Sequence, residues 1–402
     1  MTQVPGSWRR AAAGARLLGA DGEVAPTIFA EMSALAGRTG AINLGQGFPD
    51  DEGPAEVLEA ARRAIADGQN QYPPGRGTPD LRAAIAEHQE RFYGLSWDPG
   101  SEILVTAGAT EALTASLLAL LEPGDEVVVF EPFYDSYAAA IALAGARLVP
   151  VRLRWPGFQP DPEELAAAVT DRTRAILVND PHNPTGTMFT AEVRSLVVEL
   201  AERHDALIIT DEVYEHLAFA RAHSPIAAIP GARDRTISIS SGGKTFRTTG
   251  WKIGWLTAPA ELVTAILTVK QYLTYVNGSP FQPAIAAGLR LPDAFFDELA
   301  LDMRAKSEAL GRGLDAAGFA VSRPAGTYFT VADAASLGYD DAAEFCRALP
   351  GLAGVVGVPL SAFVTAEHHD EYRSLVRFAA CKRIGMLEEA AGRLAQLAGV
   401  TR

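Results

Sequence analysis

The chain has 402 residues, of which 48% are hydrophobic, so it is long enough for two domains or for one large domain with a smaller one appended. Its formal net charge of −14 argues against nucleic acid and anionic membranes as partners, because no overall basic field attracts a polyanion. No apolar run approaches the ~20 residues that span a bilayer, and two cysteines provide neither a disulfide framework nor a zinc-binding spacing. We therefore predict a cytoplasmic protein without a metal site, in which any phosphate site is local.

The first 25 residues are rich in Arg, Ala and Gly and lack the apolar core of a signal peptide, which predicts a flexible arm. Apolar residues at helical spacing, Phe29, Met32 and Leu35, then lead into the segment AINLGQGFPD. Gly45 and Gly47 in this segment let the backbone turn or approach a ligand closely.

The segment NQYPPGRGTPDLR combines an irregular loop with the start of a helix. Thr78 suits the N-cap position and Pro79 the first helical position. Tyr72 therefore lies on the preceding loop, where it either anchors the loop or contacts a neighbouring group.

The stretch from Ile103 to Tyr137 predicts a strand, a small-residue turn, a helix, a second turn and a second strand. Its first turn, Gly108 to Thr110, opens the helix, and helix N-termini bind phosphate through free N–H groups and the helix dipole. Ala109 and Thr110 are therefore candidate phosphate-binding residues.

The alternation of strands and helices continues toward the middle of the chain. The segment DPEEL opens a helix, with Asp161 as the cap and Glu164 completing a capping box. The strand in AILVNDPHNPTG ends in a turn with Asn179 and Asn183, and asparagine in such a turn usually has a structural role. Asp211 follows the apolar run ALIIT; it either faces solvent or, if buried, needs a cationic partner.

The segment SSGGKTFRTTGWKIGW follows a short strand and contains two lysines. Its glycines allow a sharp turn, so we expect Lys244 on a loop. Lys252 lies in an otherwise apolar run, where an ammonium group is costly unless it meets an anion. An aldehyde cofactor that carries a phosphate needs such a pair of lysines.

The C-terminal third predicts helices over 261–275 and 293–314, strands in FAVSRP, TYFTVAD and SLVRFAACK, and a closing helix near 386–397. Arg377 lies within the last strand between apolar residues, so its guanidinium needs an anion. That anion is either a substrate carboxylate or a buried acidic side chain.

Three motifs of this chain resemble those of fold-type I pyridoxal-phosphate aminotransferases of class I/II, and they occur in the order expected for that family. They are LGQGFP, the NxxxNPTG spacing and SSGGKTFRTTGWKIGW. The resemblance runs from about Phe29 to the C-terminus. It implies an α/β fold with a mixed, mostly parallel seven-stranded sheet between helices, plus a small α+β domain. It further implies an arm over 1–25, a small domain over 26–50 and 300–402, and a large cofactor-binding domain over 51–299.

The resemblance also implies a role for each candidate residue in a homodimer that binds pyridoxal 5′-phosphate and acts on an amino acid and a 2-oxo acid. Lys244 would bind the cofactor aldehyde and serve as general base and acid, Asp211 would pair with the ring nitrogen, and Tyr214 would donate to the phenolic oxygen. The cofactor contacts would be completed by Ala109, Thr110, Tyr134, Asn183, Ser241, Lys252 and, from the partner subunit, Tyr72. The substrate would contact Gly47, Phe29, Asn183 and Arg377.

The substrate remains open among several alternatives. Short segments such as NQYPPG and EPFYDSY resemble actinobacterial N-succinyldiaminopimelate aminotransferases, for which Arg247 and Arg76 are candidate second cations unless they face solvent. A broad kynurenine, methionine and glutamine type, with a pocket lined by Phe29, Tyr275 and Tyr328, is the rival. A cysteine-conjugate β-lyase and a cofactor-binding protein without catalysis are further alternatives.

Overall fold

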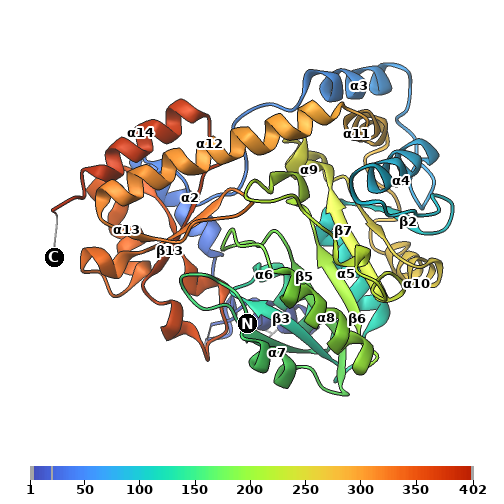
Figure 1. Ribbon diagram of the computed structural model, residues 1–402, viewed down its shortest axis with the longest axis horizontal. Coiled ribbons are helices and arrows are strands. Elements are labelled where there is room, and N and C mark those ends of the chain that lie inside the picture. The colour runs from blue at the N-terminus through green and yellow to red at the C-terminus, as the bar shows by residue number, and fades with distance from the viewer. Residues whose placement is uncertain (1–3, 20, 400–402) are drawn as a thin grey trace.

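The computed structural model describes residues 4–19 and 21–399 (Figure 1). Its largest sheet has the strand order β2-β8-β7-β6-β5-β3-β4, and every strand is parallel to the others except β8, which is antiparallel to both neighbours. The strands are β2 (Ile103–Thr106), β3 (Glu126–Glu131), β4 (Arg147–Arg152), β5 (Thr173–Asn179), β6 (Leu207–Asp211), β7 (Thr236–Ser241) and β8 (Gly254–Thr257). The predicted mixed, mostly parallel seven-stranded sheet is therefore confirmed.

The sheet is covered by helices on both faces, which explains why its strands read as continuous apolar runs. Along β3, Val127 and Val129 pack into one core while Val128 and Phe130 pack into another, as the two-residue period of a strand requires. The first core is closed by α5 (Gly108–Leu120), α6 (Asp135–Ala144) and α10 (Ala260–Lys270), and the second by α7 (Pro162–Ala168) and α8 (Ala191–Arg203).

A third cluster of helices covers the edge formed by β2 and β8 (Figure 1). These helices are α3 (Ala55–Ala66), α4 (Pro79–Tyr93) and α11 (Gln282–Leu289). The long helix α12 (Asp293–Ala317) runs from this cluster to the other half of the molecule, where it lies along α14 (Ile384–Ala395). Gly313 permits this approach, because a Cβ atom there would lie 2.5 Å from the Ala391 Cα atom.

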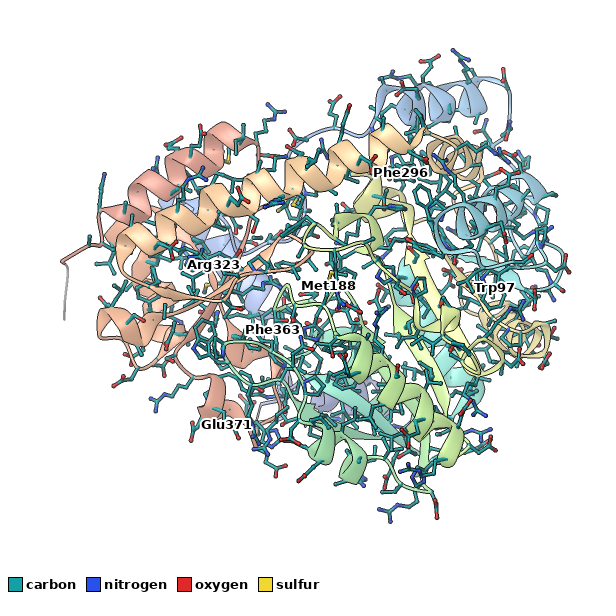
Figure 2. All side chains as sticks on the ribbon, viewed as in Figure 1. Trp97, Met188, Phe296, Arg323, Phe363 and Glu371 are labelled. Atoms are coloured by element: carbon teal, nitrogen blue, oxygen red, sulfur yellow. The ribbon has the colours of Figure 1, made fainter. Side chains whose placement is uncertain are left out.

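The second half of the molecule is built on two smaller sheets. A four-stranded antiparallel sheet has the order β12-β13-β10-β9, and β1 pairs in parallel with β11. The strands and helices are α2 (Ile28–Thr39), β1 (Ile42–Asn43), β9 (Ala320–Val321), β10 (Phe329–Asp333), α13 (Ala342–Ala353), β11 (Val355–Val356), β12 (Val358–Pro359) and β13 (Leu375–Ala379). Side chains fill the space between the two halves, with Phe363 near the middle of the molecule (Figure 2). The domain boundaries drawn from the sequence stay predictions.

Short helical turns connect these elements. They are α9 (Gly242–Thr245) and the 3-10 helices η1 (Glu215–Leu217), η2 (Ile226–Ala228), η3 (Arg233–Arg235), η4 (Thr249–Trp251), η5 (Ser279–Phe281), η6 (Ala334–Leu337), η7 (Leu360–Phe363) and η8 (His369–Tyr372). Within the described residues, none of the helices combines the length and the apolar character needed to cross a membrane.

The predicted flexible arm contains a docked helix, α1 (Trp8–Gly14), that packs on α6 of its own chain. A Cβ atom on Gly14 would lie 2.6 Å from the Ala138 carbonyl oxygen and 2.7 Å from the Ala142 Cβ atom, so the two helices touch through small residues. Residues 1–3 and 20 of the predicted arm lie outside the described residues.

The local sequence signals were correct at some helix ends and wrong at others. The Thr78 hydroxyl caps α4 and Asp161 caps α7, as predicted. Glu164 does not complete a capping box, because its carboxylate accepts hydrogen bonds from the Arg152 backbone and guanidinium instead. The helix predicted over 261–275 ends at Lys270, and the predicted last residue, Tyr275, has a positive φ of 63° that excludes it from an α-helix.

Candidate active site

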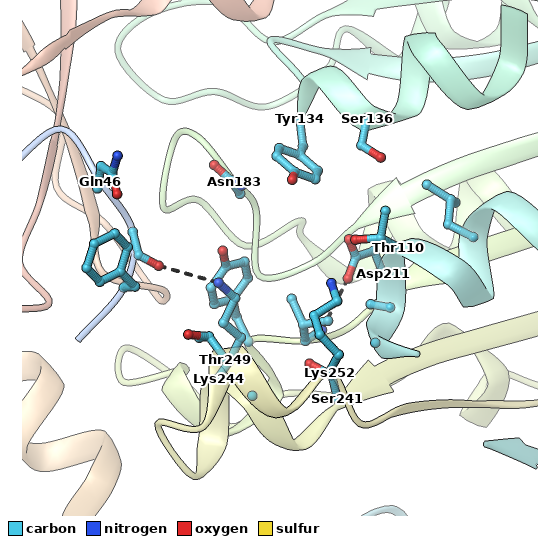
Figure 3. A pocket seen from close by; sticks show the side chains of 18 of the residues that line it. Gln46, Thr110, Tyr134, Ser136, Asn183, Asp211, Ser241, Lys244, Thr249 and Lys252 are labelled. Carbon is cyan, nitrogen blue, oxygen red and sulfur yellow. Dashed lines mark hydrogen bonds between the residues drawn. The ribbon is translucent and has the colours of Figure 1, made fainter. Parts of the chain in front are cut away.

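Most of the candidate residues line one cavity, which has a volume of about 380 Å³ and lies at the carboxyl ends of β3, β5 and β6 (Figure 3). Ligands of open parallel sheets bind at this end of the strands, because the connecting loops leave a crevice there. The cavity is lined by the predicted residues Phe29, Gly47, Ala109, Thr110, Tyr134, Asn183, Asp211, Tyr214, Ser241, Lys244, Lys252 and Arg377. Tyr72, which was predicted to contact the cofactor, does not line it.

Lys244 lies in the one-turn helix α9 and not on the loop that the sequence predicted. The two glycines before it allow this turn to pack tightly, because a Cβ atom on Gly242 would lie 2.6 Å from the Ile285 Cδ1 atom. The Lys244 Nζ atom donates to the Tyr328 hydroxyl at 3.0 Å and to the Gly47 carbonyl oxygen at 3.4 Å. The amine is therefore held at the junction between the large sheet and the β10 region.

Lys252 is exposed and not buried, which corrects the prediction from its apolar neighbours. It follows η4 with a left-handed backbone, φ 54°, and this turn directs the side chain into the cavity. A Cβ atom on Gly108 would lie 3.1 Å from the Lys252 Nζ atom, so the ammonium group lies directly over the start of α5.

The start of α5 and Lys252 together make a cradle that suits a phosphate. Free N–H groups at a helix N-terminus and a nearby ammonium both favour an anion. Ala109 and Thr110 begin this helix, and Ser241 lines the same part of the cavity (Figure 3). Residues of three separate segments thus provide the donors that a phosphate requires.

Asp211 ends β6 and lies deep in the cavity. The Tyr137 hydroxyl donates to its Oδ2 atom at 2.6 Å and the Val213 backbone N–H to its Oδ1 atom at 3.4 Å. Burial raises the pKa of the Asp211 carboxyl, while these hydrogen bonds oppose that shift. A cationic ring nitrogen is the partner that such a buried carboxylate lacks.

The two asparagines of the turn after β5 have different environments. The Asn179 amide donates to the Asp211 carbonyl at 2.8 Å, and its Oδ1 atom accepts the Asn183 backbone N–H at 2.6 Å, so Asn179 supports the loop as expected. The Asn183 side chain faces the cavity. Asp180, which had no predicted role, accepts the Phe189 N–H at 3.3 Å, and burial raises its pKa to about 6.

Arg377 lies in β13 and is 1% exposed. Its guanidinium donates to the Asn183 Oδ1 atom at 3.1 Å and to the Gly45 carbonyl at 2.7 Å. No carboxylate in residues 4–19 and 21–399 forms an ion pair with it, so the alternative of a buried salt bridge is not realised there. Burial lowers its pKa to about 10, which still leaves the guanidinium charged at neutral pH.

Aromatic rings surround this guanidinium. The Arg377 Cζ atom lies 4.2 Å from the Phe329 ring centroid, 4.7 Å from that of Phe363 and 5.3 Å from that of Phe29. Its Nε atom is buried without a hydrogen-bond partner. A carboxylate that enters the cavity would find a charged, preorganised and incompletely paired donor.

Tyrosines form the remaining polar wall. Tyr214 packs edge-on against Tyr328 with ring centroids 5.4 Å apart, and Tyr134 packs edge-on against Tyr137 with ring centroids 5.8 Å apart. Tyr72 is 81% exposed and packs against Tyr275, with ring centroids 5.6 Å apart. Within one chain, Tyr72 therefore stays outside the cavity.

Other residues named for substrate binding lie outside the cavity too. Arg247 is bonded to Asp302 at 3.1 Å, and Arg76 donates to the Ser101 carbonyl at 3.0 Å. Neither lines the cavity, and Tyr275 does not line it either.

Sequence reasoning missed Tyr137 and missed the hydrogen bond that Tyr328 makes. Tyr137 was not singled out, although it stands three residues after Tyr134 at the start of a helix, a spacing that places both side chains on one face. Tyr328 was considered only as a pocket wall, and no local signal indicates its hydrogen bond with Lys244.

Two lysines, a carboxylate and a buried arginine around one cavity are a set of residues that suits a pyridoxal-phosphate-dependent transferase. The family model for aminotransferases of class I and II matches residues 39–394. The chain belongs to this family, whose members depend on pyridoxal phosphate.

Individual relatives support the same assignment. The probable N-succinyldiaminopimelate aminotransferase of Mycobacterium tuberculosis is 51% identical over 383 residues, which cover 93% of this chain and 96% of that protein. The methionine aminotransferase of Escherichia coli is 41% identical and covers 93% of this chain and 97% of its own. The solved structure of the Mycobacterium tuberculosis N-succinyldiaminopimelate aminotransferase has a TM-score of 0.90 at 52% identity, with 93% and 98% of the two chains covered.

Proposed function

We propose that this aminotransferase transfers an amino group between N-succinyldiaminopimelate and the glutamate/2-oxoglutarate pair: one partner gives up the amino group and becomes a 2-oxo acid, while the other 2-oxo acid receives it. This is a step of lysine biosynthesis. The observation that carries the transfer itself is that Lys244, Asp211 and Arg377 face one cavity from three different parts of the fold. The 51% identity to a probable N-succinyldiaminopimelate aminotransferase supports the substrate.

Different residues would bind different parts of the cofactor. Lys252, Ser241 and the first N–H groups of α5 hold the phosphate, since they line the cavity together. Tyr134 would stack on the cofactor ring, where aromatic stacking adds about 0.5–1.5 kcal/mol beyond burial. Tyr214 and Asn183 would donate to the phenolic oxygen, and Asp211 would keep the ring nitrogen protonated. When bound, pyridoxal phosphate supplies a ring that withdraws electrons from the substrate α-carbon.

The substrate is oriented by the opposite wall. Arg377 binds the α-carboxylate through two parallel hydrogen bonds, for which its planar fork is suited. Gly47 and Phe29 border the same space. The Lys244 amine removes the proton from the substrate α-carbon as general base and then delivers it to the cofactor carbon as general acid.

The distal end of N-succinyldiaminopimelate carries further carboxylates. The cations that line the cavity are Lys244, Lys252 and Arg377, and each already has a role. The distal carboxylates therefore extend toward the mouth of the cavity. We place the partner subunit of a cytoplasmic homodimer there, with the exposed Tyr72 of each chain reaching the cofactor phosphate of the other.

A broader specificity is the rival function, and the aromatic lining favours it. Phe29, Phe48 and Phe329 line the cavity, and apolar side chains such as those of methionine or kynurenine gain free energy by covering such rings. A methionine aminotransferase is 41% identical to this chain.

A single-turnover experiment separates the two functions. The loss of visible cofactor absorbance is followed as the enzyme meets N-succinyldiaminopimelate, glutamate, methionine and kynurenine in turn. Rapid conversion by the first two alone supports the proposal, and comparable conversion by methionine or kynurenine contradicts it. Release of pyruvate and ammonia from S-alkyl cysteine without a 2-oxo acid would indicate a β-lyase.

The assignment of Lys244 as the residue that binds the cofactor has its own test. Lys244→Ala and Lys244→Arg should both lose turnover and the covalently bound cofactor, because neither side chain has an amine that condenses with an aldehyde. Borohydride reduction followed by peptide mapping locates the attachment in the wild type. A reduced cofactor on any other lysine would contradict the assignment.

A further inference from the structure

The Tyr328 hydroxyl makes two hydrogen bonds with residues that line the cavity. It accepts from the Lys244 Nζ atom at 3.0 Å and donates to the Gly47 carbonyl oxygen at 2.5 Å. A phenol has one donor and two acceptor positions, so the single Tyr328 proton goes to the Gly47 carbonyl and the lysine amine donates to a lone pair of the same oxygen.

The ring that carries this hydroxyl is rigidly held. Tyr328 is 2% exposed and packs edge-on against Tyr214 at 5.4 Å and Phe329 at 4.7 Å between ring centroids. Its backbone carbonyl accepts the Ala380 N–H at 2.6 Å. The hydroxyl therefore cannot move away from Lys244 without disturbing this packing.

The backbone before Tyr328 is strained in a way that serves this placement. Thr327 has φ 62°, a left-handed conformation that is rare for a β-branched residue. Its hydroxyl accepts the Phe329 N–H at 3.0 Å and so stabilises the turn. Strain of this kind persists where the surrounding structure requires one particular geometry.

Gly47 is shaped to receive the same hydroxyl. A Cβ atom there would lie 2.8 Å from the Tyr328 Cε2 atom and 2.8 Å from the Phe329 Cζ atom. Any side chain at this position would push the ring away, so the glycine is required for the contact between Tyr328 and the Gly47 carbonyl.

We propose that Tyr328 is a positioning residue for Lys244: its hydroxyl holds the lysine amine against the Gly47 carbonyl whenever that amine is not bonded to the cofactor. This proposal rests on the proposed role of Lys244 as the proton-transferring amine. Since a lysine side chain has four freely rotating bonds, one fixed acceptor restricts the amine to the region where it must act. Burial raises the pKa of Tyr328, so its phenol stays neutral and acts only as a hydrogen-bonding group.

The direct test is Tyr328→Phe, which removes the hydroxyl and keeps the ring. Tyr372→Phe is the matched control, because Tyr372 is also buried and its hydroxyl donates to the Glu131 and Leu153 carbonyls away from the cavity. The first measurement uses no amino acid: pyridoxal phosphate is added to the cofactor-free protein, and the rate of covalent attachment is followed by visible absorbance. We expect attachment about tenfold slower in Tyr328→Phe and unchanged in Tyr372→Phe.

The second measurement is the kinetic isotope effect with α-deuterated glutamate. In Tyr328→Phe, kcat should fall about tenfold with KM within twofold, and the isotope effect should rise because proton transfer has become slower. A merely structural role would lower the amount of active enzyme and leave the isotope effect unchanged.

A second variant, Gly47→Ala, tests the proposal independently in case Tyr328→Phe does not fold. Gly47→Ala keeps the Tyr328 hydroxyl but displaces the ring, so it should slow covalent attachment as well. Wild-type attachment rates and isotope effects in Tyr328→Phe would overturn the proposal. A wild-type enzyme whose reduced cofactor lies on a lysine other than Lys244 would instead overturn the proposed function.

Discussion

The Arg377 guanidinium donates to the Asn183 side-chain oxygen at 3.1 Å, although 194 positions separate the two residues in the chain. Arg377 comes from the small antiparallel sheet, and Asn183 comes from the loop after β5 of the large sheet. Because the pair spans both sheets, the wall that receives a carboxylate forms only when the two halves of the molecule are packed together.

Replacement of Arg377 should lower the activity of the enzyme without lowering its stability. In Arg377→Met, kcat/KM should fall about 100-fold or more, because the carboxylate loses both hydrogen bonds. The melting temperature should stay equal or rise, since the variant no longer buries a guanidinium whose Nε atom lacks a partner. Steady-state kinetics measure the loss of kcat/KM, and thermal unfolding of the cofactor-free protein measures the melting temperature. A clear loss of stability would show that Arg377 holds the fold together.

Replacement of Lys252 should weaken the binding of the phosphate alone. Lys252→Gln should lower the affinity for pyridoxal phosphate by about 10–100-fold, because a charge-assisted hydrogen bond is lost. Affinity for pyridoxal, which has no phosphate, should stay within twofold, and equilibrium titration of the cofactor-free protein measures both. Lys382→Gln is the matched control, because Lys382 donates to the Phe48 carbonyl and does not line the cavity. Equal losses for the two ligands would contradict the proposed phosphate cradle.

Replacement of Tyr137 should change the charge state of Asp211. Its hydroxyl donates to the carboxylate and so lowers the pKa of Asp211 against the effect of burial. In Tyr137→Phe that pKa should rise further, so the acidic limb of the kcat profile should move to higher pH and kcat should fall about tenfold at neutral pH.

Tyr93→Phe provides the control for this pH profile. Tyr93 donates to the Glu215 carboxylate at 2.6 Å, in a buried pair that does not line the cavity. Tyr93→Phe removes the same kind of hydrogen bond, but at a carboxylate outside the cavity. The acidic limb of the kcat profile should therefore stay in place. A shift of the same size in both variants would exclude a specific effect on Asp211.

Buried histidines should make the protein sensitive to mild acid. Burial lowers the pKa of His88 to about 3, and its Nε2 atom lies 2.6 Å from that of His216. Below about pH 6.5 the unfolded chain takes up a proton at this histidine while the folded chain does not, so stability falls as the pH falls toward 3. The slope amounts to as much as ~1.4 kcal/mol per pH unit for each such group.

Melting temperatures between about pH 7 and pH 4 measure this slope. His88→Gln should flatten it, whatever its effect on stability at neutral pH. His369→Gln should leave it unchanged, because the His369 side chain is 39% exposed and is hydrated in both states. Identical slopes in all three proteins would show that acid unfolding depends on other groups.

Much of the fold and of the cofactor site follows from the sequence by itself. The apolar runs and helix caps predict an alternation of strands and helices, and this holds because strand burial and caps such as Thr78 and Asp161 are local effects. The mostly parallel sheet was implied by the resemblance to the aminotransferase family, and the structure confirms it. The motifs around Lys244 and Asn183 could be recognised because each of these residues lies within a short stretch whose turn chemistry is local.

Tertiary packing alone decided the environment of these residues. Lys252 is exposed despite its apolar neighbours, because a left-handed turn points it into the cavity. Tyr328 meets Lys244 and Gly47 only through the contact of three distant segments. Periodicity and turn chemistry report on neighbours along the chain, whereas these contacts depend on how the small sheet packs against the large one, and no local pattern encodes that arrangement.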